Sequence, residues 1–205
     1  MAKEKGFHHF SDSYFQDHSK KIVLGADGNA RVEYVYEGIY YTMEGTDRQW
    51  LRGKVRYLLL SAAAAALLLV GMTTETALNR VTDVMLLQIF SLFLFLGLGI
   101  GVVNRLTVPR SMTKWEYRMG VATVKECSLL LVWSLGVLLL DGCGALVFGR
   151  IGFDWKSAQV LLEILGGLLL ILCQYRLVKK ERYREEISDD LPTGTDITSD
   201  FGPVP

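Results

Sequence analysis

Apolar residues in this chain gather in four long runs that short polar segments separate. The runs cover about 55–72, 84–103, 127–148 and 158–178. A helix needs roughly 20 mostly apolar residues to cross the ~30 Å hydrocarbon core of a bilayer. The pattern therefore predicts an all-α membrane protein built as a bundle of four transmembrane helices.

The third run is less regular than the others. Pro109 and Ser111 resemble a helix start, so we expect this helix to begin near Ser111 and to enter the bilayer near Val121. Asp141 and Gly142 are expected to end the span. The predicted transmembrane domain is 51–180, with spans at about 55–72, 84–103, 121–141 and 158–178.

Composition and the position of the first run support this interpretation. Half of the 205 residues are apolar, and the mean hydropathy is +0.26. In a soluble helical domain, amphipathic helices would have to cover these apolar segments, and the chain leaves no room for them. The first run begins after residue 50, and the start of the chain leads into His8, His9 and Asp12 rather than an apolar core, so we expect an uncleaved anchor rather than a signal peptide.

Basic residues mark which loops stay inside the cell, because short loops rich in Lys and Arg remain cytoplasmic. Only Arg80, Arg150 and Lys156 lie in the first and third connections between the helices. Three tryptophans, Trp50 among them, lie near predicted boundaries, as interfacial aromatic residues do. The pattern predicts a multi-pass plasma-membrane protein with both termini in the cytoplasm. The other basic residues near helix ends lie before the first helix, in the middle loop or after the last helix. They are Arg48, Arg52, Lys54, Arg56, Arg105, Arg110, Lys114, Arg118, Lys125, Arg176, Lys179, Lys180, Arg182 and Arg184.

The segment 1–50 before the first helix has a strand-like pattern. Apolar residues at 22–24 and alternating residues at 32–36 flank Asp27-Gly28, which suits a tight turn. The residues 39–43 could add a third strand to this tyrosine-rich hairpin. A sheet this small is marginal in water. It should therefore lean on the membrane surface, on the helix ends or on another protein.

The remaining polar segments give no sign of a metal, cofactor or nucleic-acid site. His8, His9 and His18 lack a ligand spacing and are interpreted as part of a solvated leader, and the three cysteines are scattered. Acidic and basic residues balance at 22 each, and topology accounts for the basic ones. The cytoplasmic tail 181–205 is rich in Gly, Ser, Thr and Asp, which predicts disorder from about residue 189.

Two groups of residues are candidate sites within the spans. Gly97 and Gly101 form a Gly-x-x-x-Gly pair that suits close helix packing. In the last helix, Gln159, Glu163 and Gln174 share one polar stripe, and lipid cannot satisfy such groups. Glu163 is the only acid well inside a predicted span. Its role remains open between a structural hydrogen bond and the handling of an ion or proton.

The chain carries no catalytic motif, and we expect no enzymatic activity and no catalytic residues. The favoured hypothesis is a non-catalytic membrane component, a small subunit or accessory protein of a complex. Its expected contacts are the lipid bilayer and a protein partner or second copy, through the helices and the 22–43 hairpin. The alternative is an oligomeric transporter or channel subunit that uses the polar stripe around Glu163.

Overall fold

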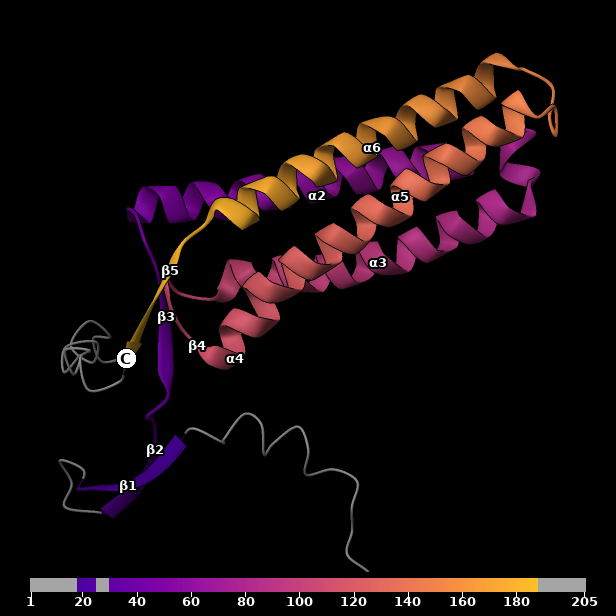
Figure 1. Ribbon diagram of the computed structural model, residues 1–205. Coiled ribbons are helices and arrows are strands. Elements are labelled where there is room, and N and C mark those ends of the chain that lie inside the picture. Colours follow the sequence, from indigo (N-terminus) through magenta and orange to yellow (C-terminus); the bar gives the residue numbers. More distant parts are fainter. Residues whose placement is uncertain (1–17, 25–29, 188–205) are drawn as a thin grey trace, which may run out of the picture.

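The protein is a closed bundle of four long antiparallel helices with a small sheet at one end (Figure 1). The computed structural model describes residues 18–24 and 30–187, with side chains from Tyr36 onward. Helix α2 packs against α3 and α6, and α5 packs against the same two helices. As predicted, all four are long and apolar enough to span a membrane. They are α2 (Asp47–Thr73), α3 (Thr82–Thr107), α5 (Thr123–Val147) and α6 (Trp155–Lys180).

Capping residues set where the helices begin. The Thr46 hydroxyl accepts a hydrogen bond from the Gln49 backbone at 3.3 Å, and the Gln49 side chain accepts one from the Thr46 backbone at 3.0 Å. This capping box starts α2 before the predicted span. The same device at Thr113 starts the short helix α4 (Lys114–Tyr117). A π-helical turn at Arg118–Ala122 joins α4 to α5.

Helix α5 does not stop at Asp141 but continues to Val147. Gly142 lies against α6, where an added Cβ would come within 2.6 Å of Leu161 Cδ2. This glycine therefore allows two helices to approach rather than ending one. Asp141 lies 3.9 Å from the Arg150 guanidinium in the following connection, and the opposite charge offsets part of the cost of a carboxylate there.

A three-stranded antiparallel sheet gathers segments that are far apart in the sequence. Its central strand is β3 (Ile39–Met43), which pairs with β4 (Ser111–Thr113) on one edge and β5 (Tyr183–Ile187) on the other. One expectation is corrected here, because Ser111 belongs to a strand and not to the start of a helix. Strand β5 lies in the tail before the segment that is predicted to be disordered. Residues 188–205 lie outside the described part of the chain.

The predicted hairpin is present but does not extend into a meander. Strands β1 (His18–Leu24) and β2 (Ala30–Tyr36) pair antiparallel with Ile22 opposite Val32. The expected turn at Asp27-Gly28 lies outside the described residues. The prediction that 39–43 extends this hairpin is wrong, because β4 and β5 already satisfy the backbone groups on both edges of β3.

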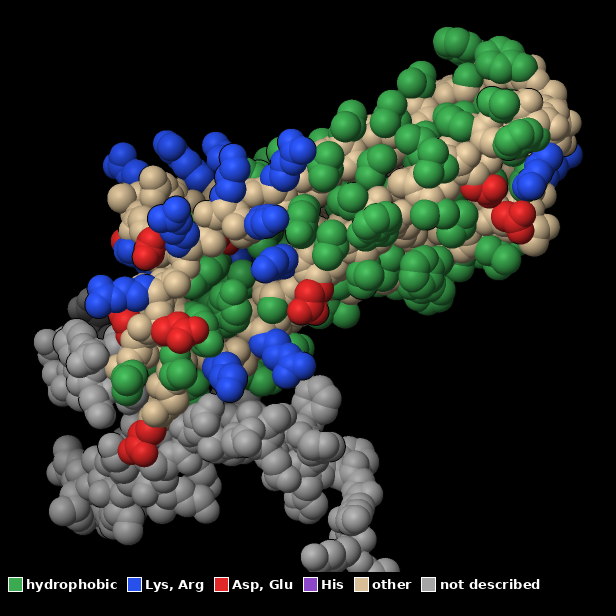
Figure 2. All heavy atoms as spheres, in the orientation of Figure 1, with side chains coloured by type: hydrophobic (Ala, Val, Ile, Leu, Met, Phe, Trp, Pro, Cys, Tyr) green, Lys and Arg blue, Asp and Glu red, His purple; other side chains and the backbone are tan. Residues whose placement is uncertain are grey.

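The kind of side chain exposed on the surface changes along the length of the molecule. Figure 2 shows apolar side chains over most of the helical bundle, while Lys and Arg gather beside the sheet. Phe93 and Leu140 are 66% and 74% exposed within the bundle region. An exposed apolar surface this large is unusual for a soluble monomer, and it is consistent with an integral membrane protein. We call the end with the sheet the basic end, and the other the opposite end.

The two glycines of the Gly-x-x-x-Gly pair face helix α5. A Cβ added at Gly101 would lie 3.0 Å from Thr123 Cγ2 and 3.2 Å from the Val124 backbone nitrogen, and one added at Gly97 would lie 3.3 Å from Cys127 Sγ. A Cβ added at Gly99 would meet no atom within 4 Å. Of these three positions, only Gly101 lies close to a backbone atom of α5.

We expect Gly101→Leu to lower the free energy of unfolding by about 1–3 kcal/mol, the usual cost of overpacking. The added side chain would have to push α5 away, because backbone atoms as well as side chains stand in its way. Gly99→Leu is the matched control and should leave stability near that of the wild type. Thermal unfolding in a mild detergent measures both. Equal melting temperatures for the two variants would contradict the assigned α3–α5 contact.

Candidate functional site

A buried ion pair joins two helix ends at the basic end. Arg105, in the last turn of α3, donates from Nη2 to Glu181 Oε2 at 2.6 Å, and Glu181 directly follows α6. The Arg105 side chain is 1% exposed and that of Glu181 is 9% exposed. Because both charges have left water, the pair is stable only with further partners.

Tyrosine hydroxyls and aromatic rings supply those partners. Tyr57 donates to Glu181 Oε1 at 2.6 Å, and Tyr183 donates to Glu181 Oε2 at 2.7 Å. Arg105 Nη1 in turn donates to the Tyr183 hydroxyl at 3.1 Å. The guanidinium lies 4.9 Å from the centroid of the Trp50 ring and 4.7 Å from that of Tyr57, distances typical of cation–π contacts. We call these five residues, Trp50, Tyr57, Arg105, Glu181 and Tyr183, the junction cluster.

The junction cluster positions the sheet against the helices. Tyr183 is the first residue of β5, and its ring meets that of Tyr117 edge-to-face at 5.1 Å. Tyr117 also stacks on Tyr41 of β3 at 4.5 Å. Burial raises the pKa of the Tyr183 phenol above its ordinary value, so the hydroxyl keeps its proton and remains a donor to Glu181.

Two more cations fasten the loops around the cluster. Lys54 Nζ donates to the backbone oxygens of Leu106 and Val108, at 2.9 and 2.7 Å, where α3 ends. These carbonyls lack helical partners, so the ammonium satisfies groups that would otherwise need water. Arg110 donates from Nε to the Met43 oxygen at 3.0 Å. Its Nη1 also lies 3.1 Å from Asp47 at the start of α2.

A cavity of about 370 Å³ opens between α2 and α6 beside the cluster. Tyr57 and Glu181 form part of its wall. Four cationic side chains also line it. In the part of the chain whose side chains are described, none of the four forms an ion pair. They are Arg52, Arg56, Lys180 and Arg182.

The predicted polar stripe of α6 faces α2 in two separate places. Gln174 is fully buried, and its Oε1 accepts a hydrogen bond from the Ser61 hydroxyl at 2.9 Å. Near the opposite end, Gln159 is exposed and donates to Glu163 Oε1 at 2.9 Å. The other carboxylate oxygen of Glu163 is buried and has no hydrogen-bond partner among the described residues. It packs against Gly71, where an added Cβ would lie 3.2 Å away.

Apolar packing separates these two polar places. Gly167 lies between them along α6, and its Cβ position is 3.6 Å from the Ala64 backbone oxygen. Ile164 and Ile171 are almost completely buried beside it. From Glu163 to Gln174 the helix rises about 16 Å at 1.5 Å per residue. The stripe therefore consists of two separate polar contacts, and apolar side chains fill the interval.

Other buried polar side chains also pair locally. The hydroxyls of Ser91 and Ser134 lie 2.8 Å apart between α3 and α5. Gln88 donates to Asn79 Oδ1 at 2.8 Å at the opposite end. The described residues contain no group of three or more His, Cys, Asp or Glu side chains suited to a metal ion. The histidines singled out in the sequence lie outside the side chains that the structure describes.

No known protein family matches the chain, and comparisons with curated proteins and with solved structures find no similar protein. The candidate site therefore stands on its own geometry. Sequence reasoning missed the junction cluster, because Arg105 and Glu181 look like ordinary flanking charges. It also placed Trp50 at the interface, although the residue is only 7% exposed and its ring packs against Arg105. Arg105 lies in the last turn of α3, where cations commonly occur, so the sequence carried no signal of its burial.

We expect Glu181→Ala to lower the free energy of unfolding by about 3–5 kcal/mol, because it leaves the Arg105 charge buried without its carboxylate. The double variant Arg105→Met, Glu181→Leu removes both charges and should be less destabilised than the single one. Arg184→Ala is the control, since that side chain is 74% exposed and 3.9 Å from Glu186. Thermal unfolding in detergent ranks the three, and a Glu181→Ala variant as stable as the control would contradict the assigned role.

Proposed function

We propose that this chain is a non-catalytic component of a membrane complex that offers its sheet to a protein partner. The observation that carries the proposal is the sheet itself, which three distant segments build at one end of the bundle. The junction cluster fixes it to α2, α3 and α6. A sheet fixed in this way to three helices suits a role in binding and positioning a protein partner.

The sheet has features that favour contact with another protein. Ile39 and Ile187 face each other across the β3–β5 ladder and are 39% and 62% exposed. Strands β4 and β5 are edge strands, whose outer backbone groups can pair with an added strand. The β1–β2 hairpin directly precedes this surface in the chain. The proposed partner site therefore comprises the end of the sheet at Ile39 and Ile187 together with the hairpin.

The proposal places the sheet in the cytoplasm and the protein in the plasma membrane. Its support is the charge distribution, since short basic segments are retained inside the cell. The three segments that build the sheet are those flanked by most of the Lys and Arg, and Figure 2 shows them gathered at that end. Because α6 returns the chain to the same end, both termini belong to the cytoplasmic side in this proposal.

Transport is the second candidate, and one observation favours it. One carboxylate oxygen of Glu163 is buried and has no hydrogen-bond partner among the described residues. Acidic side chains inside transmembrane helices often serve ion or proton pathways. Against it, apolar packing separates Glu163 from Gln174 within one chain. A pathway would therefore have to form between chains of an oligomer.

The topology is tested with single cysteines introduced after the three native ones are replaced by serine. Gly152→Cys lies in the connection at the opposite end, where an added Cβ meets nothing within 4 Å. It should react with a membrane-impermeant maleimide in intact cells. Arg184→Cys lies on exposed β5 and should react only after permeabilisation. Labelling of Arg184→Cys in intact cells would reverse the orientation.

The partner is tested by purification from native cells in mild detergent, followed by mass spectrometry. A protein should accompany the wild type and be lost from the Ile39→Glu, Ile187→Glu variant, because the added charges oppose burial at the contact. The control Arg184→Gln should retain the partner. Transport would instead be established if the protein purifies as a homo-oligomer without a partner and conducts ions in liposomes. The Glu163→Gln variant of that oligomer should then not conduct.

A further inference from the structure

The cationic cavity at the basic end has more positive charge than its own carboxylates can neutralise. Arg52, Arg56 and Lys180 are exposed around it. Of the two acids in its wall, Glu181 already accepts hydrogen bonds from Arg105, Tyr57 and Tyr183. Four cations remain, together with Glu44, whose carboxylate has no partner among the described side chains. Such a site attracts a ligand that carries more than one negative charge.

A groove along α6 continues from this cavity toward the middle of the bundle. It has a volume of about 320 Å³ and shares Leu177 and Lys180 with the cavity. Beyond Arg176 its lining becomes apolar at Cys173, Leu172 and Leu169. From Lys180 to Leu169 the helix spans about 16 Å at 1.5 Å per residue. The cavity and groove together are thus charged at one end and apolar at the other.

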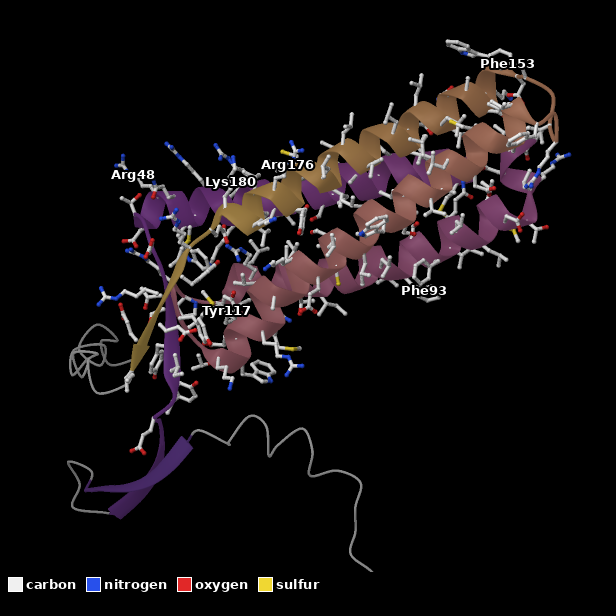
Figure 3. All side chains as sticks on the ribbon, in the orientation of Figure 1. Arg48, Phe93, Tyr117, Phe153, Arg176 and Lys180 are labelled. Carbon is white, nitrogen blue, oxygen red and sulfur yellow. The ribbon has the colours of Figure 1, made fainter. Side chains whose placement is uncertain are left out.

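We propose that the cavity and groove bind one anionic phospholipid of the leaflet around the basic end. Its phosphates contact Arg52, Arg56 and Lys180, and an acyl chain lies along Leu172 and Leu169. Figure 3 shows Arg176 and Lys180 on the part of α6 where the groove meets the cavity. The site requires only that the helices lie in a bilayer, so it goes beyond the proposed partner function and does not depend on it.

Size and chemistry both select this ligand. A volume near 370 Å³ lies at the small end of ligand pockets, which are roughly 300–1,000 Å³, and so suits a headgroup rather than a whole lipid. Arginine forks bind phosphate in a bidentate manner. The four cations favour a headgroup with several negative charges, such as a phosphorylated inositol, over a headgroup with one. The apolar groove gives an acyl chain a place that a soluble phosphate would leave empty.

Gly53 lines the cavity between Arg52 and Arg56 of α2. Its Cβ position lies 3.5 Å from Glu181 Oε1 and 3.8 Å from Tyr57 Cε2, which are ordinary contact distances. A single added carbon is therefore tolerated there, whereas a longer side chain extends into the space meant for the headgroup. Gly53 thus offers a way to block the site without changing its charge.

The test measures binding of phosphatidylinositol bisphosphate with a fluorescent acyl chain to the purified full chain in mild detergent. We expect the variant Arg52→Gln, Arg56→Gln, Lys180→Gln to bind at least about tenfold more weakly, which is about 1.4 kcal/mol, because all three charged contacts to the phosphates are lost. The matched control Lys114→Gln, Arg118→Gln, Lys125→Gln removes the same charge from exposed positions outside the cavity. It should bind within about twofold of the wild type.

Two further measurements separate the site from a diffuse charge effect and from a soluble ligand. Gly53→Leu keeps every cation and should weaken binding about as much as the triple variant, and its melting temperature reports whether the junction cluster beside it is intact. The water-soluble inositol phosphate headgroup should compete poorly, because it cannot occupy the apolar groove. Equal weakening in both triple variants would overturn the proposal, as would unchanged binding by Gly53→Leu. Competition by the free headgroup at the affinity of the lipid would make the ligand a soluble phosphate and also overturn it.

Discussion

The ion pair between Arg105 and Glu181 is the interaction on which the basic end of the molecule depends. It holds the end of α3 to the end of α6 inside the bundle, where a lone charge would be costly. The hydroxyls of Tyr57 and Tyr183 occupy the remaining positions around the carboxylate. Because Tyr183 is also the first residue of β5, the same contact fixes where that strand enters the sheet. Helix packing and sheet register are thereby set at one place.

The rest of the bundle relies on contacts of another kind. If the helices lie in lipid, the hydrophobic effect gives little drive for their association, and close packing and polar pairs must supply it. The small residues lie where close packing and polar pairs between helices require them. Gly101 and Gly142 allow close helix approach, and Ser91 and Ser134 form one isolated polar pair. Directional charge contacts concentrate at the basic end, where water and headgroups can accommodate the outer cations.

The sequence predicts what depends on long, regular patterns. Runs of about 20 apolar residues indicate the four helices, and the four-residue spacing of Gly97 and Gly101 places both on one face. The sheet has no such signal. Strand β4 has only three residues, too few for an alternating pattern. Its partners are distant in the chain, and only the packing of the helices brings them together. Arg105 escaped notice for a similar reason, since burial distinguishes it from the other flanking cations.

The cavity and the sheet share a wall, so strands β3 and β5 run from one proposed contact to the other. Met43, the last residue of β3, lines the cavity with Glu44 and Arg182. The Glu44 backbone donates to the Arg182 oxygen at 3.0 Å, so the segment from α6 to β5 borders both regions. Glu181 lies at the same wall, where it closes the junction cluster. A headgroup bound there would therefore rest directly against the segments that carry β3 and β5. The proposed lipid site thus lies at the Met43 end of the β3–β5 ladder, and the proposed partner site lies at the Ile39 end of the same two strands.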